Sequence, residues 1–155
     1  MFKKLFMTVF LMTIFIAPSF ADELQDVQTF FDNYVKAANS YSKSVTDFYL
    51  PNAKIIRVVQ KPDGTLQSVD FPMERYKKEL SKGLRLAKLS RYKNTYTNKS
   101  FKKLDDGDYK ISAIRTPNRD KAGLPFYFIV TNTKDGWKVK EESMQTTVQK
   151  FLTSK

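Results

Sequence analysis

The sequence contains no cysteine and no histidine among its 155 residues. Without cysteine the chain can form no disulfide, and it has no thiol that could act as a nucleophile or a metal ligand. Without histidine, Ser-His and Cys-His nucleophilic arrangements and imidazole metal sites are also excluded. Proton abstraction beside a carbonyl would therefore require a carboxylate, and the fold must be stabilised by packing. We expect no metal site and no cofactor.

Acidic residues are also scarce, with 16 Asp and Glu against 27 Lys and Arg. This surplus favours anionic partners, such as a phospholipid membrane, an acidic protein or a small anion. The segment from Arg75 to Lys93 holds eight bases and a single acid, Glu79. Such a run is often only a solvated helix face, but its one-sidedness also fits a docking surface. The predicted partner surface consists of Arg75, Lys78, Lys82 and Arg85.

The first 21 residues have the pattern of a cleavable secretory signal peptide. Lys3 and Lys4 form a charged start, residues 5–17 carry no charge, and small residues at Ser19 and Ala21 fit a signal-peptidase site. The alternative is an uncleaved membrane anchor, for which the apolar stretch is shorter than the ~20 residues of a spanning helix. We predict cleavage after Ala21.

Export would leave residues 22–155 as a single domain in the periplasm or outside the cell. Its net charge would be +9, because the removed segment carries two lysines and no acid. Nucleic acid is not an expected partner, since an exported protein seldom meets it.

The order of hydrophobic patterns predicts an α+β domain. Apolar residues at helical spacing run from Asp22 to Asn39, and a short helical turn follows at 45–49. A hairpin spans 53–70 around the turn at 61–64, and Pro72 opens a second helix. Four further strands are expected at about 92–104, 109–116, 126–132 and 137–147. Helices would cover one face of a curved antiparallel sheet.

Three short segments carry a resemblance to a known superfamily: 34–39 (YVKAAN), 47–53 (DFYLPNA) and 136–139 (GWKV). With them, the chain resembles the nuclear transport factor 2-like superfamily, which includes ketosteroid isomerase and polyketide-cyclase-like proteins. The resemblance implies a cone-shaped, cystatin-like fold with a cavity between the concave sheet face and the helices. These segments belong to the scaffold, so they support the fold more than an activity.

Matched against the isomerase pattern, the chain keeps one catalytic position of three. Tyr34 falls at the position of the oxyanion-stabilising tyrosine. Arg57 falls where the general-base aspartate would be, and the strand 126–132 offers no carboxylic acid. A hydrolase arrangement around Arg57 would need two inward acids, for which only Asp47 and Asp70 are near in sequence. The resemblance therefore favours binding over catalysis.

Strand alternation places Arg57 on the same side as Ala53, Ile55 and Val59. If that side faces the cavity, a guanidinium is available there for a carboxylate or phosphate. The alternatives are that the faces are reversed, or that Arg57 reaches the rim of the cavity and pairs with a structural acid. The predicted ligand-binding residues are Tyr34, Arg57, Ile55, Phe126 and Phe128.

Three functions remain open at this point. The leading hypothesis is a non-enzymatic exported domain that binds a small apolar or amphiphilic anion in its cone. The second is a protein-interaction module in a periplasmic or secretion-related assembly, with a filled cone and a partner on the basic helix. The third is an isomerase- or dehydratase-like enzyme, which requires a carboxylate pointing into the cavity. The resemblance also implies a possible homodimer through the outer face of the sheet.

Overall fold

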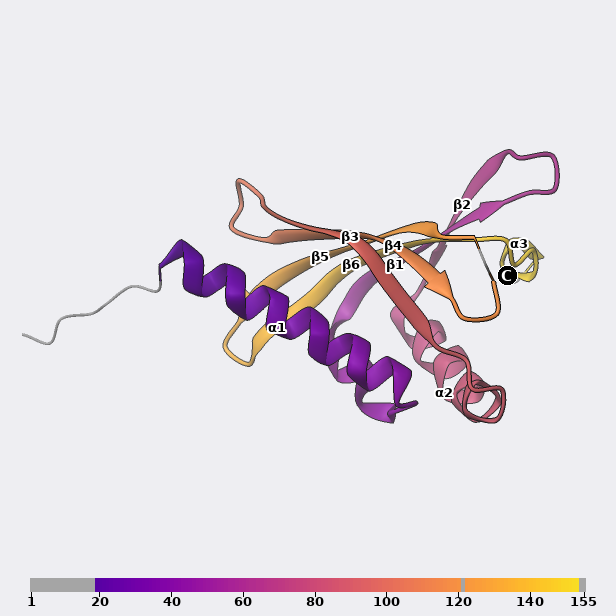
Figure 1. Cartoon of the computed structure of the whole chain (residues 1–155), viewed down its shortest axis with the longest axis horizontal. Coiled ribbons are helices and arrows are strands. Elements are labelled where there is room, and N and C mark those ends of the chain that lie inside the picture. Colours follow the sequence, from indigo (N-terminus) through magenta and orange to yellow (C-terminus); the bar gives the residue numbers. More distant parts are fainter. Residues whose placement is uncertain (1–18, 121, 154–155) are drawn as a thin grey trace, which may run out of the picture.

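A computed structural model describes residues 19–120 and 122–153 (Figure 1). Most of the predicted signal peptide lies outside these residues, and only positions 19–21 can be placed, at the start of the first helix. Within the described ranges, no helix combines the length and the apolar character needed to cross a membrane.

The chain forms three α-helices, one 3₁₀-helix and six strands in the described residues. The helices are α1 (Phe20–Asn39), η1 (Lys43–Phe48), α2 (Met73–Leu89) and the short α3 (Lys150–Thr153). The strands are β1 (Tyr49–Gln60), β2 (Leu66–Phe71), β3 (Asn94–Lys103), β4 (Tyr109–Pro117), β5 (Leu124–Thr133) and β6 (Gly136–Thr146). The predicted elements are all present, and α3 is an addition to them.

The six strands form one curved sheet in the order β2-β1-β6-β5-β4-β3, with α1 and α2 on the same side (Figure 1). This confirms the predicted α+β class and the sheet covered by helices. One pairing differs from an all-antiparallel sheet, because β1 runs parallel to β6. The parallel pair joins the N-terminal hairpin, β1 and β2, to the C-terminal meander of β3 to β6.

The helix α1 buries one stripe against the concave face of the sheet. Val27, Phe31 and Tyr34 are its buried residues, spaced at three and four positions. The helix begins two residues before the predicted start, because Ser19 and Asp22 form a reciprocal capping box that satisfies its first backbone N–H groups. The Phe31 ring packs edge-on against Phe128, so the stripe is anchored in an aromatic core.

The C-terminal end of α1 is fixed to the sheet by the Asn39 side chain. Its amide nitrogen donates to the Asn94 carbonyl at 2.8 Å, and its amide oxygen accepts from the Asn94 N–H at 2.9 Å. Tyr41 follows in the left-handed region, with φ of 60°, and closes the helix through the paired bonds of a Schellman motif. This end of α1 therefore has a defined position over β3.

The helix α2 is packed much less deeply than α1. Only Met73, in its first turn, is buried, and the apolar residues that follow it at helical spacing are half-buried: Tyr76, Leu80, Leu84 and Ala87. Gly83 lies on the same side, and a Cβ added there would meet no atom within 4 Å. The helix thus stands off the sheet along most of its length and leaves space beneath it.

Candidate functional site

A cavity of about 360 Å³ lies between α2, the end of α1 and the concave face of the sheet. This volume is within the range of small-molecule sites. Its surface is mainly apolar and aromatic, although thirteen of the lining residues carry a polar or charged group. The polar and charged side chains of the lining are Tyr34, Asn39, Tyr41, Arg57, Tyr76, Glu79, Tyr92, Asn94, Tyr96, Arg115, Glu142, Thr146 and Lys150.

Arg57 and Glu142 form a buried ion pair in the cavity wall. The Arg57 Nη1 atom lies 2.7 Å from Glu142 Oε1, and their side chains are only 6% and 2% exposed. Burial opposes the charge on Arg57, but the combined attraction of Glu142, Tyr76 and Tyr49 raises its pKa above the ordinary value. Arg57 therefore keeps its charge, and Glu142 is its partner in the ion pair.

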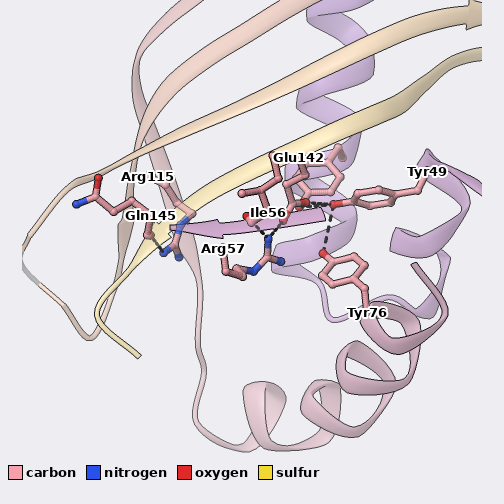
Figure 2. A network of polar contacts seen from close by, with 8 residues as sticks. Tyr49, Ile56, Arg57, Tyr76, Arg115, Glu142 and Gln145 are labelled. Carbon is pink, nitrogen blue, oxygen red and sulfur yellow. Dashed lines mark hydrogen bonds and ion pairs between the residues drawn. The ribbon is translucent and has the colours of Figure 1, made fainter. Parts of the chain in front are cut away.

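Three tyrosines complete the surroundings of Glu142, and Figure 2 shows two of them, Tyr49 and Tyr76. The Tyr49 hydroxyl donates a short hydrogen bond to Glu142 Oε2 and lies 3.2 Å from the Tyr76 hydroxyl and 3.3 Å from that of Tyr34. Burial, reinforced by the Glu142 charge, raises the pKa of Tyr76 to about 12 and those of Tyr34 and Tyr49 well above the usual range. All three phenols are thus neutral donors near neutral pH.

A β-bulge in β6 turns Glu142 toward the cavity. Val139 pairs with Val130 and Glu141 pairs with Ile129, which leaves Lys140 as an extra residue without a partner on β5. Before the bulge the odd-numbered Val139 is buried, and after it the buried side belongs to even-numbered residues such as Glu142. Simple alternation from Val139 would have placed Glu142 on the opposite face.

Arg115 is a second buried arginine in the cavity wall, and it has no acidic partner among the described residues. It is 4% exposed, and none of the ion pairs in that part of the chain includes it. Its Nη1 donates to the Asn94 side-chain oxygen at 2.8 Å and to the Tyr92 hydroxyl at 3.1 Å.

The remaining nitrogens of Arg115 are weakly satisfied. Nη2 donates to the Gln145 carbonyl at 3.4 Å, and the buried Nε has no hydrogen-bond partner within the described chain. Figure 2 shows Arg115 bonded to Gln145 and apart from the set formed by Arg57, Glu142, Tyr49 and Tyr76. A buried guanidinium with neutral acceptors and a free N–H is a binding group for an anion.

The structure brings together only some of the residues predicted to bind a ligand. Tyr34, Arg57 and Phe126 line the cavity. Ile55 and Phe128 are completely buried and belong to the core behind the cavity wall. Arg57 faces the cavity, so the faces of β1 are not reversed, and it pairs there with a buried acid, Glu142.

The predicted partner surface lies on the side of α2 that faces away from the cavity. Lys78, Lys82 and Arg85 are exposed, and Arg75 is half-buried with its guanidinium 4.6 Å from the centre of the Phe71 ring. Asp47 and Asp70, the acids considered near Arg57, are both exposed and are not in the cavity lining.

Two functional side chains of the cavity were missed from the sequence. Arg115 could have been found, because it continues the alternation of Tyr109, Ile111 and Ala113, which are separated by the polar Lys110 and Ser112, and it therefore shares their buried face. Glu142 could not be found by alternation, because the bulge at Lys140 reverses the faces of β6.

The site can hold an anion and can donate hydrogen bonds, but its potential for acid–base chemistry is limited. Glu142 is the only carboxylate in the lining that is buried, and both its oxygens already accept bonds from Arg57 and Tyr49. Among the described residues, no group of three or more Asp and Glu side chains could hold a metal ion.

Comparison with known proteins gives a fold and no activity. No family model matches the chain. No curated protein matches it either.

Solved structures do match along most of the chain. A nuclear transport factor 2-like protein of unknown function from Shewanella oneidensis is 15% identical, with a TM-score of 0.59, and the match covers 79% of this chain and 98% of that one. A nuclear transport factor 2-like protein of unknown function from Pseudomonas putida is 9% identical, with a TM-score of 0.61 and coverages of 81% and 87%. A domain with a cystatin-like fold from Nostoc punctiforme is 13% identical, with a TM-score of 0.53 and coverages of 88% and 85%.

Proposed function

We propose that this chain, which has the nuclear transport factor 2-like fold, is a binding protein for a small amphiphilic anion. The observation that carries the proposal is Arg115, a buried guanidinium that lines an open cavity and has no acidic partner in the described chain. A cation in such a place costs several kcal/mol unless an anion compensates it. A bound carboxylate, sulfonate or phosphate would supply that compensation.

The rest of the cavity fits the apolar part of such a ligand. Leu80 and Leu84 from α2 face Phe126 and Met144 from the sheet across the cavity. Contact with these side chains would remove the ligand's hydrocarbon from water. In this proposal Arg57 has a supporting role, because its charge is already neutralised by Glu142.

The inward carboxylate keeps an enzymatic function as the second candidate. Glu142 lies beside three neutral tyrosine hydroxyls, a combination that could move a proton and stabilise an oxyanion. To accept a proton from a substrate, however, Glu142 would have to give up bonds to Arg57 or Tyr49. The cavity itself is a feature that the protein-interaction hypothesis does not predict.

A cavity-filling variant tests whether the ligand enters this space. We would titrate decanoate into the wild type, Gly83→Ala and Gly83→Phe by calorimetry. Because Gly83 lines the cavity and a Cβ there has open space, Ala should leave the affinity unchanged and Phe should lower it about tenfold or more. Equal decanoate affinity for the Phe and Ala variants would overturn the proposed site.

Export is a separate part of the proposal. It is supported by the charged start, the apolar stretch at 5–17 and the small residues at Ser19 and Ala21. Mass spectrometry of the protein expressed with its own N-terminus in a secretion-competent bacterium should find a chain that begins at Asp22. A chain retained in the cytoplasm with residues 1–21 intact would contradict it.

A further inference from the structure

We propose that the outward face of α2 docks on an anionic membrane surface. This inference goes beyond the proposed function, because docking needs no ligand in the cavity. It concerns the α2 docking face, defined here by Lys78, Lys82, Arg85, Leu86 and Leu89.

The α2 docking face lies opposite the cavity. At 100° per residue, Lys78, Lys82, Arg85 and Leu89 fall within one narrow stripe, and Leu86 lies at its border. The cavity is lined by the other side of the same helix, through Leu80, Gly83, Leu84 and Ala87. In Figure 1, α2 lies at the edge of the molecule, away from the sheet.

Two leucines in this face are unusually exposed. Leu86 and Leu89 are 69% and 74% exposed, which are the highest values of any large apolar side chain among the described residues. They are three positions apart and therefore lie on one side of the last turns of α2. Their exposure is unfavourable in water, and insertion into an apolar phase would remove it.

The charges around the leucines select an anionic surface. Lys78, Lys82 and Arg85 are exposed, and none takes part in an ion pair in the part of the chain that the structure describes. The bases of α2 outnumber its acids by six to two: Glu74 stands in the first turn, at the N-terminal end of the docking face, and Glu79 borders the face and also lines the cavity. Basic side chains can bind lipid phosphates while neighbouring leucines enter the interface.

The shape of this face favours a lipid bilayer over an acidic protein. It is a single convex helix with two projecting leucines, and a protein partner would need a groove shaped to receive them. A bilayer needs no such groove, because its lipids rearrange around inserted side chains. Docking through α2 would also bring the helix that forms one wall of the cavity to the lipid surface.

Vesicle binding tests the proposal, with the chain that begins at Asp22, which is the predicted mature form and lacks the apolar segment 5–17. We expect it to sediment with vesicles of phosphatidylcholine and phosphatidylglycerol, to bind weakly to phosphatidylcholine alone, and to be released by salt. The double variant Lys78→Glu/Arg85→Glu should bind anionic vesicles with an affinity lowered by about tenfold or more. Leu86→Ser/Leu89→Ser should also weaken binding, without a change of charge.

Two matched variants make the outcome specific. Lys54→Glu/Lys102→Glu changes the net charge by the same amount on exposed positions of β1 and β3, and it should keep most of the binding. Gly83→Phe, which fills the cavity, should bind vesicles like the wild type, so that failure of docking and failure of ligand binding are told apart. No binding to anionic vesicles, an equal loss in the Lys54/Lys102 variant, or unchanged binding in both α2 variants would overturn the proposal.

Discussion

The Arg57 guanidinium lies 2.7 Å from the Glu142 carboxylate, and both side chains are almost completely buried. This contact joins β1 to β6, the parallel pair that connects the two halves of the sheet. It also divides the two arginines of the cavity into different classes. Arg57 is neutralised by the protein, whereas Arg115 has only neutral acceptors in the described chain.

Removal of Glu142 should be strongly destabilising. Glu142→Leu leaves Arg57 buried without a counter-charge, which should lower the free energy of unfolding by about 3–5 kcal/mol. Adding Arg57→Met to the same chain should recover most of that loss, because the uncompensated charge is then gone. Urea denaturation of the two single variants and the double variant measures the coupling. Additive losses would show that the two side chains do not act as a pair.

Arg115 should behave in the opposite way. Replacement of Arg115 by Met removes a buried charge that has no acidic partner, so the free energy of unfolding should rise by about 1 kcal/mol in the absence of ligand. Arg57→Met is the matched control, since it removes a paired guanidinium and should lower stability. Urea midpoints of both variants decide the matter. A loss of stability in Arg115→Met as large as that in Arg57→Met would mean that Arg115 is a structural residue.

The tyrosines around Glu142 predict a loss of stability at alkaline pH. Burial raises the pKa of Tyr76 to about 12 in the folded chain, above the value near 10 of an unfolded tyrosine. Between these values the unfolded chain binds fewer protons, so stability is complete below about pH 10 and falls as the pH rises toward 12. Tyr34 and Tyr49, with pKa values raised by burial, act in the same direction.

The measurement is urea denaturation at a series of pH values, together with phenolate absorbance. Tyr76→Phe should show a shallower decline above pH 10 than the wild type, because one of the coupled groups no longer titrates. Tyr41→Phe is the control, because the Tyr41 hydroxyl makes no buried hydrogen bond among the described residues. Identical pH profiles for the wild type and Tyr76→Phe would contradict the burial of this hydroxyl.

Replacement of Arg91, at the C-terminal end of α2, by glycine should stabilise the protein. Arg91 has a φ of 52° and closes the helix in a Schellman arrangement, through Arg91 N–H to Lys88 and Tyr92 N–H to Ala87. A side chain in this region costs roughly 1–2 kcal/mol, which glycine avoids. Arg91→Gly should therefore raise the thermal midpoint, and Arg91→Ala, which loses the same charge and keeps the strain, should not. Equal midpoints would refute this view of the turn.

The helices and strands could be predicted from the sequence, because its apolar residues recur with clear helical and strand periods. The α1 stripe at Val27, Phe31 and Tyr34 and the alternation in β1 follow directly from the pattern of apolar residues. Strand order was less accessible, because the parallel contact of β1 with β6 joins segments that are more than 80 positions apart. Local pattern carries no information about such a pairing.

The site was only partly predictable for a related physical reason. Arg57 could be assigned to the inner face by alternation, but its partner Glu142 is brought inward by an irregularity at Lys140 that no period reveals. Tyr76 could be assigned to the inner stripe of α2, but its contact with Tyr49 depends on how far α2 stands from the sheet. That distance is a property of the packed molecule.

In the proposed function, Arg115 binds the charged group of an amphiphilic ligand in the cavity. This is tested by calorimetric titration with decanoate and with decanol, in the wild type and in Arg115→Met, and Lys54→Met on the exposed side of β1 is the control for loss of one charge. We predict that the wild type and Lys54→Met prefer decanoate to decanol by about tenfold or more, and that Arg115→Met has no preference. A preference for decanoate that survives in Arg115→Met would contradict the claim.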